Sequence, residues 1–222
     1  MMVKRTETKI PKKIDPFRDD DTCRSDLERY RLLAVEMGAS DAIVIQSDQV
    51  IVENRVRGKC IVPKCPFYGL SVNCPPHSLS SEEIRVMLKE YKYGVFIRLI
   101  VPSDKIAGER AFEEDAMRSF RKEIQDIVSE LESTGFYDGY HLAMGFAAGT
   151  CKRSFCPDIE CSALIPGKGC RHPLRARPSM ESVGMNVYTM AAKVGWDIYP
   201  VGKTVSPNDL PHGNYFGLVM IY

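Results

Sequence analysis

Seven of the eight cysteines lie in two short segments of the chain, residues 59–77 and 150–173. These are Cys60, Cys65 and Cys74 in the first segment, and Cys151, Cys156, Cys161 and Cys170 in the second. The steps of five and nine residues within the first trio recur between the last three cysteines of the second segment. Clustered thiols at repeated spacing, in loops rich in proline and glycine, indicate metal ligation, whereas structural core cysteines would be scattered.

The composition of the chain limits the class of protein and the cellular compartment that we expect. The 222 residues suffice for one ordinary domain, and 44% hydrophobic with 27% charged residues is a globular composition. Thirty Lys and Arg against twenty-nine Asp and Glu give no overall field that would favour nucleic acid or a membrane surface. No apolar run approaches the roughly 20 residues of a membrane span. The first residues lack the apolar core of a signal peptide, so we expect a cytoplasmic, reducing setting without disulfides.

Two kinds of metal centre compete for the cysteines. Structural zinc sites prefer closely spaced pairs, two to four residues apart, so that one ion receives both thiolates. Here the intervals hold four and eight residues. Iron–sulfur clusters are larger and accept longer loops, often with proline after a cysteine, as at Cys65, Cys74 and Cys156. The pattern therefore favours [4Fe–4S] clusters, with zinc as the alternative.

The two loops differ in the number of ligands they supply. The second loop has four cysteines, a full set for one [4Fe–4S] cluster, whereas the first has three. The fourth ligand of the first site is left open by the sequence. It is Cys23, His77 or Cys151, or the position is free for a substrate or a partner's ligand.

A family resemblance rests on these same segments. The runs CIVPKCPFYGLSVNCPPHS and CKRSFCPDIECSALIPGKGCRHPLRARPSMES resemble a prokaryotic family of uncharacterised, predicted metal-binding proteins, common in methanogens and other anaerobes. The resemblance covers the chain from about Ile43 onward. It implies a metal, iron–sulfur in kind, and an association with corrinoid-dependent methyl transfer, which the spacing of the cysteines does not show.

These observations predict an iron–sulfur protein with two [4Fe–4S] clusters, acting as electron carrier or redox accessory protein. Its partner would be a redox or methyl-transfer protein of an anaerobe. One alternative is an enzyme that uses an open-site cluster at the three-cysteine loop on a small substrate, with Arg175 or Arg177 directed into that site. The other alternative is a structural zinc protein.

The elements that position the loops follow from hydrophobic periodicity. We expect one α/β domain over residues 23–222, with a mixed sheet, helices packed on it and a polar extension at 1–22. A helix and then an apolar strand follow each cysteine loop, which suggests an internal duplication. Helices are predicted over 25–38, 80–92, 109–133 and 179–195, with N-caps at Ser25, Ser80 and Ser179. Strands are predicted over 42–46, 49–56, 93–101, 140–149, 196–201 and 214–222.

Overall fold

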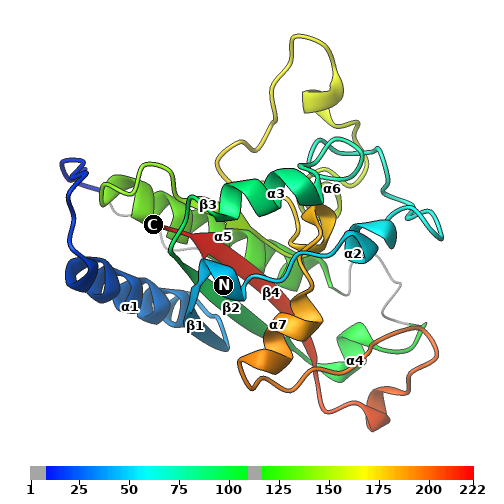
Figure 1. Ribbon diagram of the computed structural model, residues 1–222. Coiled ribbons are helices and arrows are strands. Elements are labelled where there is room, and N and C mark those ends of the chain that lie inside the picture. The colour runs from blue at the N-terminus through cyan, green and yellow to red at the C-terminus, as the bar shows by residue number, and fades with distance from the viewer. Residues whose placement is uncertain (1–8, 110–116) are drawn as a thin grey trace.

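The computed structural model describes residues 9–109 and 117–222, which form a single α/β domain (Figure 1). Its sheet has the strand order β1-β2-β4-β3. The strands are β1 (Asp41–Gln46), β2 (Tyr93–Val101), β3 (Met144–Phe146) and β4 (Gly213–Met220). Every neighbouring pair is antiparallel, so the sheet differs from the mixed sheet expected from the sequence.

Helices cover both faces of this sheet and bury two apolar clusters. On one face lie α1 (Asp20–Glu36) and α5 (Arg118–Tyr137), whose apolar residues pack on Val95, Ile97 and Val219. On the other face lie α3 (Ser81–Leu88) and α7 (Val187–Lys193), packed on Phe96 and its neighbours. Because both faces are covered, β2 is apolar and buried over nearly its whole length, as its uninterrupted apolar sequence predicts.

Short elements make up most of the remaining chain. The α-helical ones are α2 (Asn54–Gly58), α4 (Ser103–Ile106) and α6 (Cys151–Phe155). The 3₁₀ turns are η1 (Ser47–Gln49), η3 (Ser162–Leu164), η4 (Glu181–Val183) and η5 (Pro207–Asp209). Both cysteine loops consist mainly of turns and lie outside the sheet (Figure 1).

Helix starts were predictable where the capping chemistry is unambiguous. The box formed by Ser80 and Glu83 at the start of α3 is confirmed, with each side chain bonded to the other's backbone amide. Helix α1 begins earlier than predicted, because Asp19 rather than Ser25 caps it by accepting a bond from the Thr22 amide at 2.7 Å. Asn186 rather than Ser179 caps α7.

Three of the predicted strands are absent or shortened. Residues 49–56 form no strand, because their backbone pairs only locally with the segment around Met185 before α2 begins. Residues 196–201 form no strand either, and the strand predicted at 140–149 is limited to β3.

Part of the helix predicted over 109–133 lies outside the described residues, which omit 110–116. The duplication stays a hypothesis. Loop, helix and central strand do follow one another in both halves, and β2 and β4 are neighbours in the sheet. In the second half, however, residues 194–212 separate α7 from β4 without a further strand.

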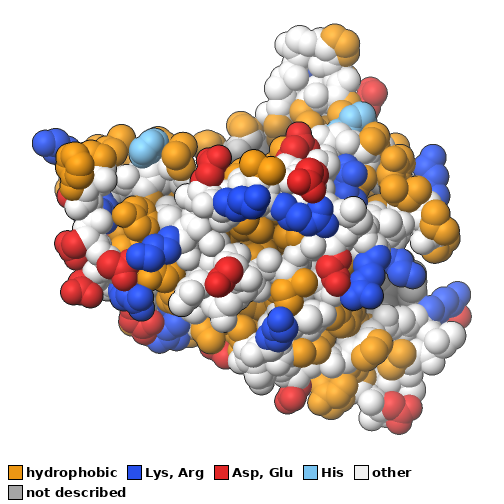
Figure 2. All heavy atoms as spheres, viewed as in Figure 1, with side chains coloured by type: hydrophobic (Ala, Val, Ile, Leu, Met, Phe, Trp, Pro, Cys, Tyr) orange, Lys and Arg blue, Asp and Glu red, His pale blue; other side chains and the backbone are white. Residues whose placement is uncertain are grey.

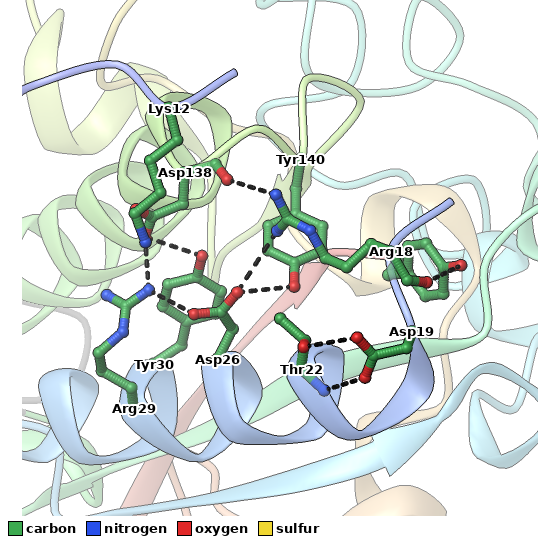
Figure 3. Close-up of polar contacts among 10 residues, drawn as sticks. Lys12, Arg18, Asp19, Thr22, Asp26, Arg29, Tyr30, Asp138 and Tyr140 are labelled. Atoms are coloured by element: carbon green, nitrogen blue, oxygen red, sulfur yellow. Dashed lines mark hydrogen bonds and ion pairs between the residues drawn. The ribbon is translucent and has the colours of Figure 1, made fainter. Parts of the chain in front are cut away.

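The segment before α1 is fastened to the end of α5 by a network of charged and aromatic side chains (Figure 3). Asp138 is the acceptor at its centre, contacted by Lys12 at 2.8 Å, Arg29 at 2.6 Å and the Tyr30 hydroxyl at 2.9 Å. Burial raises the pKa of the Asp138 carboxyl, but hydrogen bonds from Lys12, Arg29 and Tyr30 outweigh it and leave the pKa below its usual value. This network closes the first apolar cluster against solvent.

The network predicts an acid-sensitive contribution to stability. A depressed carboxyl pKa stabilises the fold above the unfolded-state pKa, and this stabilisation is lost as the pH falls through the folded-state pKa. Asp138→Asn should therefore lower the free energy of unfolding by about 1–3 kcal/mol at pH 7, and by much less below about pH 3. Chemical denaturation at both pH values measures this, with Asp48→Asn, an exposed carboxylate, as control. A loss that is equal at both pH values would contradict the assignment.

Candidate metal centre

The first cysteine loop, residues 59–77, is a chain of turns that are bonded mainly to one another. The Cys65 amide donates to the Cys60 carbonyl at 3.0 Å, and the Gly69 amide donates to the Pro75 carbonyl at 2.8 Å. Gly69 has a φ of 78°, a conformation that a side chain would strain. The Phe67 amide also donates to the Cys65 sulfur at 3.5 Å. The loop thus fixes the backbone around its three cysteines without using the sheet.

The second cysteine loop, residues 150–173, starts on the short helix α6 and extends away from the body of the domain (Figure 1, yellow). The Lys152 ammonium links separate parts of the loop. It donates hydrogen bonds to the carbonyls of Cys156 at 3.2 Å and Ile159 at 2.8 Å. The Ser162 hydroxyl closes the far end by donating to the Gly169 carbonyl at 2.7 Å. These bonds bring cysteines that are up to nineteen residues apart around one space.

That space is a cavity lined by all four cysteines of the second loop. Its wall also includes Ser71 of the first loop and His172, whose ring lies 5.3 Å from that of Phe155. Yet nowhere in the described part of the chain do three or more His, Cys, Asp or Glu side chains converge closely enough to hold one metal ion. The cysteines surround a volume rather than a point.

The two loops meet at Cys151. The Ser71 hydroxyl lies 3.2 Å from the Cys151 sulfur, and the Asn73 amide group donates to the same sulfur at 3.5 Å. In the reverse direction, the Cys74 thiol donates to the Thr150 hydroxyl at 3.2 Å. Each loop therefore supplies hydrogen-bonding groups to a cysteine or its neighbour in the other loop.

Cys74 and Cys151, at this junction, are the two most deeply buried of the seven loop cysteines, each 8% exposed. Burial raises the pKa of the Cys74 thiol to about 11, and it also raises that of Cys151. Without metal both thiols are protonated at neutral pH, so metal binding must release their protons. The other five cysteines are half-buried.

Cys23 does not lie at this centre. It is fully buried in the first apolar cluster, on the inner face of α1 and beside Tyr140. His77 is exposed at the surface, which leaves Cys151 as the candidate fourth ligand with a demonstrated contact to the first loop. The structure thus places four of the seven predicted ligands around one cavity, joins the first cysteine loop to that cavity at Cys151, and places the eighth cysteine in the hydrophobic core.

The arginines that follow Cys170 are bound to α5. Arg175 forms a two-point ion pair with Asp126 at 2.7 and 2.8 Å, and Arg177 forms one with Glu132 at 2.7 and 2.8 Å. Both guanidinium groups therefore fasten the end of the second loop to the domain rather than point into the three-cysteine site. Their carboxylate partners on α5 carry no sequence signal that would have revealed this role.

Sequence reasoning also missed Ser71, Asn73 and Thr150. Each is a short polar residue within three positions of a cysteine, which is the only signal that could have suggested contact with a sulfur. Their partners lie about eighty positions away in the chain, and only the folded structure joins them.

Comparison with known families agrees with this geometry. The family described as Predicted metal-binding protein (DUF2284) matches residues 43–221, a stretch that contains both cysteine loops and excludes Cys23. The chain belongs to this family. No curated protein and no solved structure shows a significant match. As a DUF2284 member, the chain carries the family's predicted metal-binding character, and its loop cysteines are the groups suited to it. No helix among the described residues is long and apolar enough to cross a membrane.

The placement of Cys23 yields a direct test. Cys23→Ala should leave the metal content per chain unchanged while lowering the free energy of unfolding by about 1–2 kcal/mol, because a buried side chain is shortened. Cys156→Ala, the matched change in the second loop, should remove metal. Elemental analysis and chemical denaturation of both variants measure these effects. Loss of metal from Cys23→Ala would show that this thiol is a ligand after all.

Proposed function

We propose that this protein is an iron–sulfur protein that holds two [4Fe–4S] clusters and serves as electron carrier or redox accessory protein for an anaerobic enzyme system. The observation that carries the proposal is a cavity lined by four thiols of the second loop, at the place where the first cysteine loop contacts Cys151 and Thr150. When bound, such clusters accept and donate single electrons at a potential that the surrounding protein sets.

The arrangement of the side chains fits a group larger than one ion. A tetrahedral zinc site requires four sulfurs about 2.3 Å from one point, hence tightly converged thiols. Four of the described cysteines line a common cavity, and the intervals of four and eight residues between the cysteines are longer than most zinc-ligand pairs have. Sulfur ligands around a volume suit a polynuclear cluster, which is the support for iron–sulfur over zinc.

The loop backbone is also suited to tune a cluster. The Phe67 amide donates to the Cys65 sulfur at 3.5 Å, and the His172 amide donates to the Cys170 sulfur at 3.3 Å. Hydrogen bonds to ligand sulfurs stabilise the reduced, more negative state and so raise the reduction potential. Each loop supplies one such hydrogen bond from its own backbone, so the reduction potentials of both sites would be raised in the same way.

The surface around the loops carries a charge that the whole chain does not. Residues 55–77 and 150–178 contain ten Lys and Arg against two Asp and Glu, and an excess of positive charge remains after Arg55, Arg175 and Arg177 are paired with carboxylates outside these segments. Figure 2 shows Lys and Arg side chains gathered at the end of the molecule that carries α2 and the first cysteine loop. This end would attract an acidic protein and repel a basic one.

Exposed apolar side chains accompany these charges. Val62 is 72% and Leu174 is 81% exposed, and Ile61, Leu70 and Ile159 are also exposed on the two loops. Apolar contacts inside a charged rim are the usual anatomy of a protein–protein interface. We therefore infer that the partner is a redox protein with an acidic rim. The link to corrinoid-dependent methyl transfer rests on the family resemblance alone.

The cofactor assignment predicts a definite stoichiometry. Protein purified without oxygen should contain about eight irons and about eight acid-labile sulfides per chain, and its broad visible absorption should bleach on reduction. Metal and sulfide analysis beside the absorption spectrum measures this. Zinc without sulfide would contradict the redox proposal and indicate a structural metal protein. About four irons per chain would indicate one cluster, in the second loop.

The charge pattern predicts how electron transfer depends on salt. Electron transfer from the reduced protein to an acidic flavodoxin, used as probe, should slow as ionic strength rises, because screening weakens the attraction. Lys64→Glu combined with Lys168→Glu should slow it about tenfold at low salt. Lys13→Glu, an exposed lysine of the N-terminal segment, is the matched control. Stopped-flow rates that are equal in all three proteins would argue against docking at the loops.

A second candidate function is an enzyme in which the cluster of the first loop binds a substrate. The observation in its favour is that Cys60 and Cys65 are half-exposed and Cys23 is absent from their surroundings. An iron without a protein ligand would then face solvent. Addition of cyanide to the reduced protein should shift the spin-resonance signal of one cluster in that case, and should leave the spectrum unchanged if every iron is ligated by the chain.

A further inference from the structure

The number of ligands does not match two independent sites. Two [4Fe–4S] clusters of the ordinary kind require four cysteines each, or about eight in all. The chain has eight cysteines, but Cys23 is fully buried in the core at α1. The loops therefore offer seven, three at the first site and three at the same spacing at the second, with Cys151 outside both trios.

Cys151 contacts residues of both loops. It lines the cavity of the second loop together with Cys156, Cys161 and Cys170. Its sulfur is also within 3.2 Å of the Ser71 hydroxyl and 3.5 Å of the Asn73 side chain, both in the stretch that leads to Cys74. The adjacent Thr150 hydroxyl accepts from the Cys74 thiol at 3.2 Å. The seventh sulfur thus occupies the boundary between the two sites.

We propose that Cys151 is a shared ligand whose thiolate bridges the two metal sites, so that the protein holds one seven-cysteine double centre rather than two separate clusters. This inference rests on the proposed iron–sulfur function. A deprotonated sulfur has lone pairs enough to bind one iron on each side, so six loop cysteines and one bridge supply four ligands to each site. The arrangement leaves no iron open to a substrate.

The surroundings of Cys151 suit a shared thiolate. A metal-bound sulfur has lost its proton, so the Ser71 hydroxyl must donate to it, as the Asn73 side chain does. Two donors from the first loop then stabilise negative charge on a sulfur that belongs by sequence to the second. Removal of either donor is expected to affect the potentials of both sites, because both irons share the sulfur.

Single alanine variants test the bridge. Cys60→Ala and Cys156→Ala each remove a member of one trio, and Cys23→Ala serves as the control outside the centre. Iron and sulfide analysis, spin-resonance spectra and redox titration under anaerobic conditions compare them with Cys151→Ala. We expect Cys151→Ala to alter the signals of both sites, and each trio variant to alter chiefly its own. The magnetic interaction between the clusters in the reduced protein should be lost in Cys151→Ala.

If Cys151→Ala alters only the second site and leaves the first with its original spectrum and potential, the bridge is refuted while the two-cluster function stands. Zinc without sulfide in the unaltered protein would instead refute the function itself. Should Cys151→Ala fail to fold, Ser71→Ala gives a second test. It should make reduction of both clusters about tenfold less favourable, equivalent to about 59 mV each for one electron. A shift confined to one cluster would overturn the shared ligand.

Discussion

The contact between the Ser71 hydroxyl and the Cys151 sulfur, 3.2 Å apart, is the interaction on which the rest of this centre depends. It joins segments eighty residues apart, and Cys74 and Cys151 are both buried at this junction. A polar group removed from water needs a partner, so each loop is incomplete without the other. The paired loops are therefore one structural unit, although each is internally hydrogen-bonded and lies outside the sheet.

The domain acts as a frame that holds this unit at one end. The neighbouring strands β2 and β4 form the centre of the sheet, and helices on both faces exclude water from it. Segment 178–186 continues the frame toward the first loop, where Arg57 and Ser78 both donate to the Ser182 carbonyl. On the opposite side, the ion pairs of Arg175 and Arg177 with α5 fasten the second loop. Both cysteine loops are thus anchored to the domain by residues other than their cysteines.

The sequence predicted the parts of this account that depend on local chemistry. The cysteine spacing identified seven candidate ligands, the apolar run at Tyr93–Val101 identified the central strand, and Ser80 with Glu83 identified a helix start. It could not predict that Cys23 faces the core, because a helix face is defined by what packs on it. Pairing of all strands as antiparallel, and the meeting of Ser71 with Cys151, are long-range outcomes that local spacing does not encode.

The most direct test of the central claim, a sulfur-ligated iron centre at the joined loops, is X-ray absorption at the iron edge of anaerobically purified protein. The account predicts a first shell made of sulfur alone and a second shell of iron, because thiolates and cluster sulfides surround each metal. The Cys23→Ala variant should give the same spectrum. A first shell containing oxygen or nitrogen without neighbouring iron would contradict the account. So would a sample whose only metal is zinc with sulfur at about 2.3 Å.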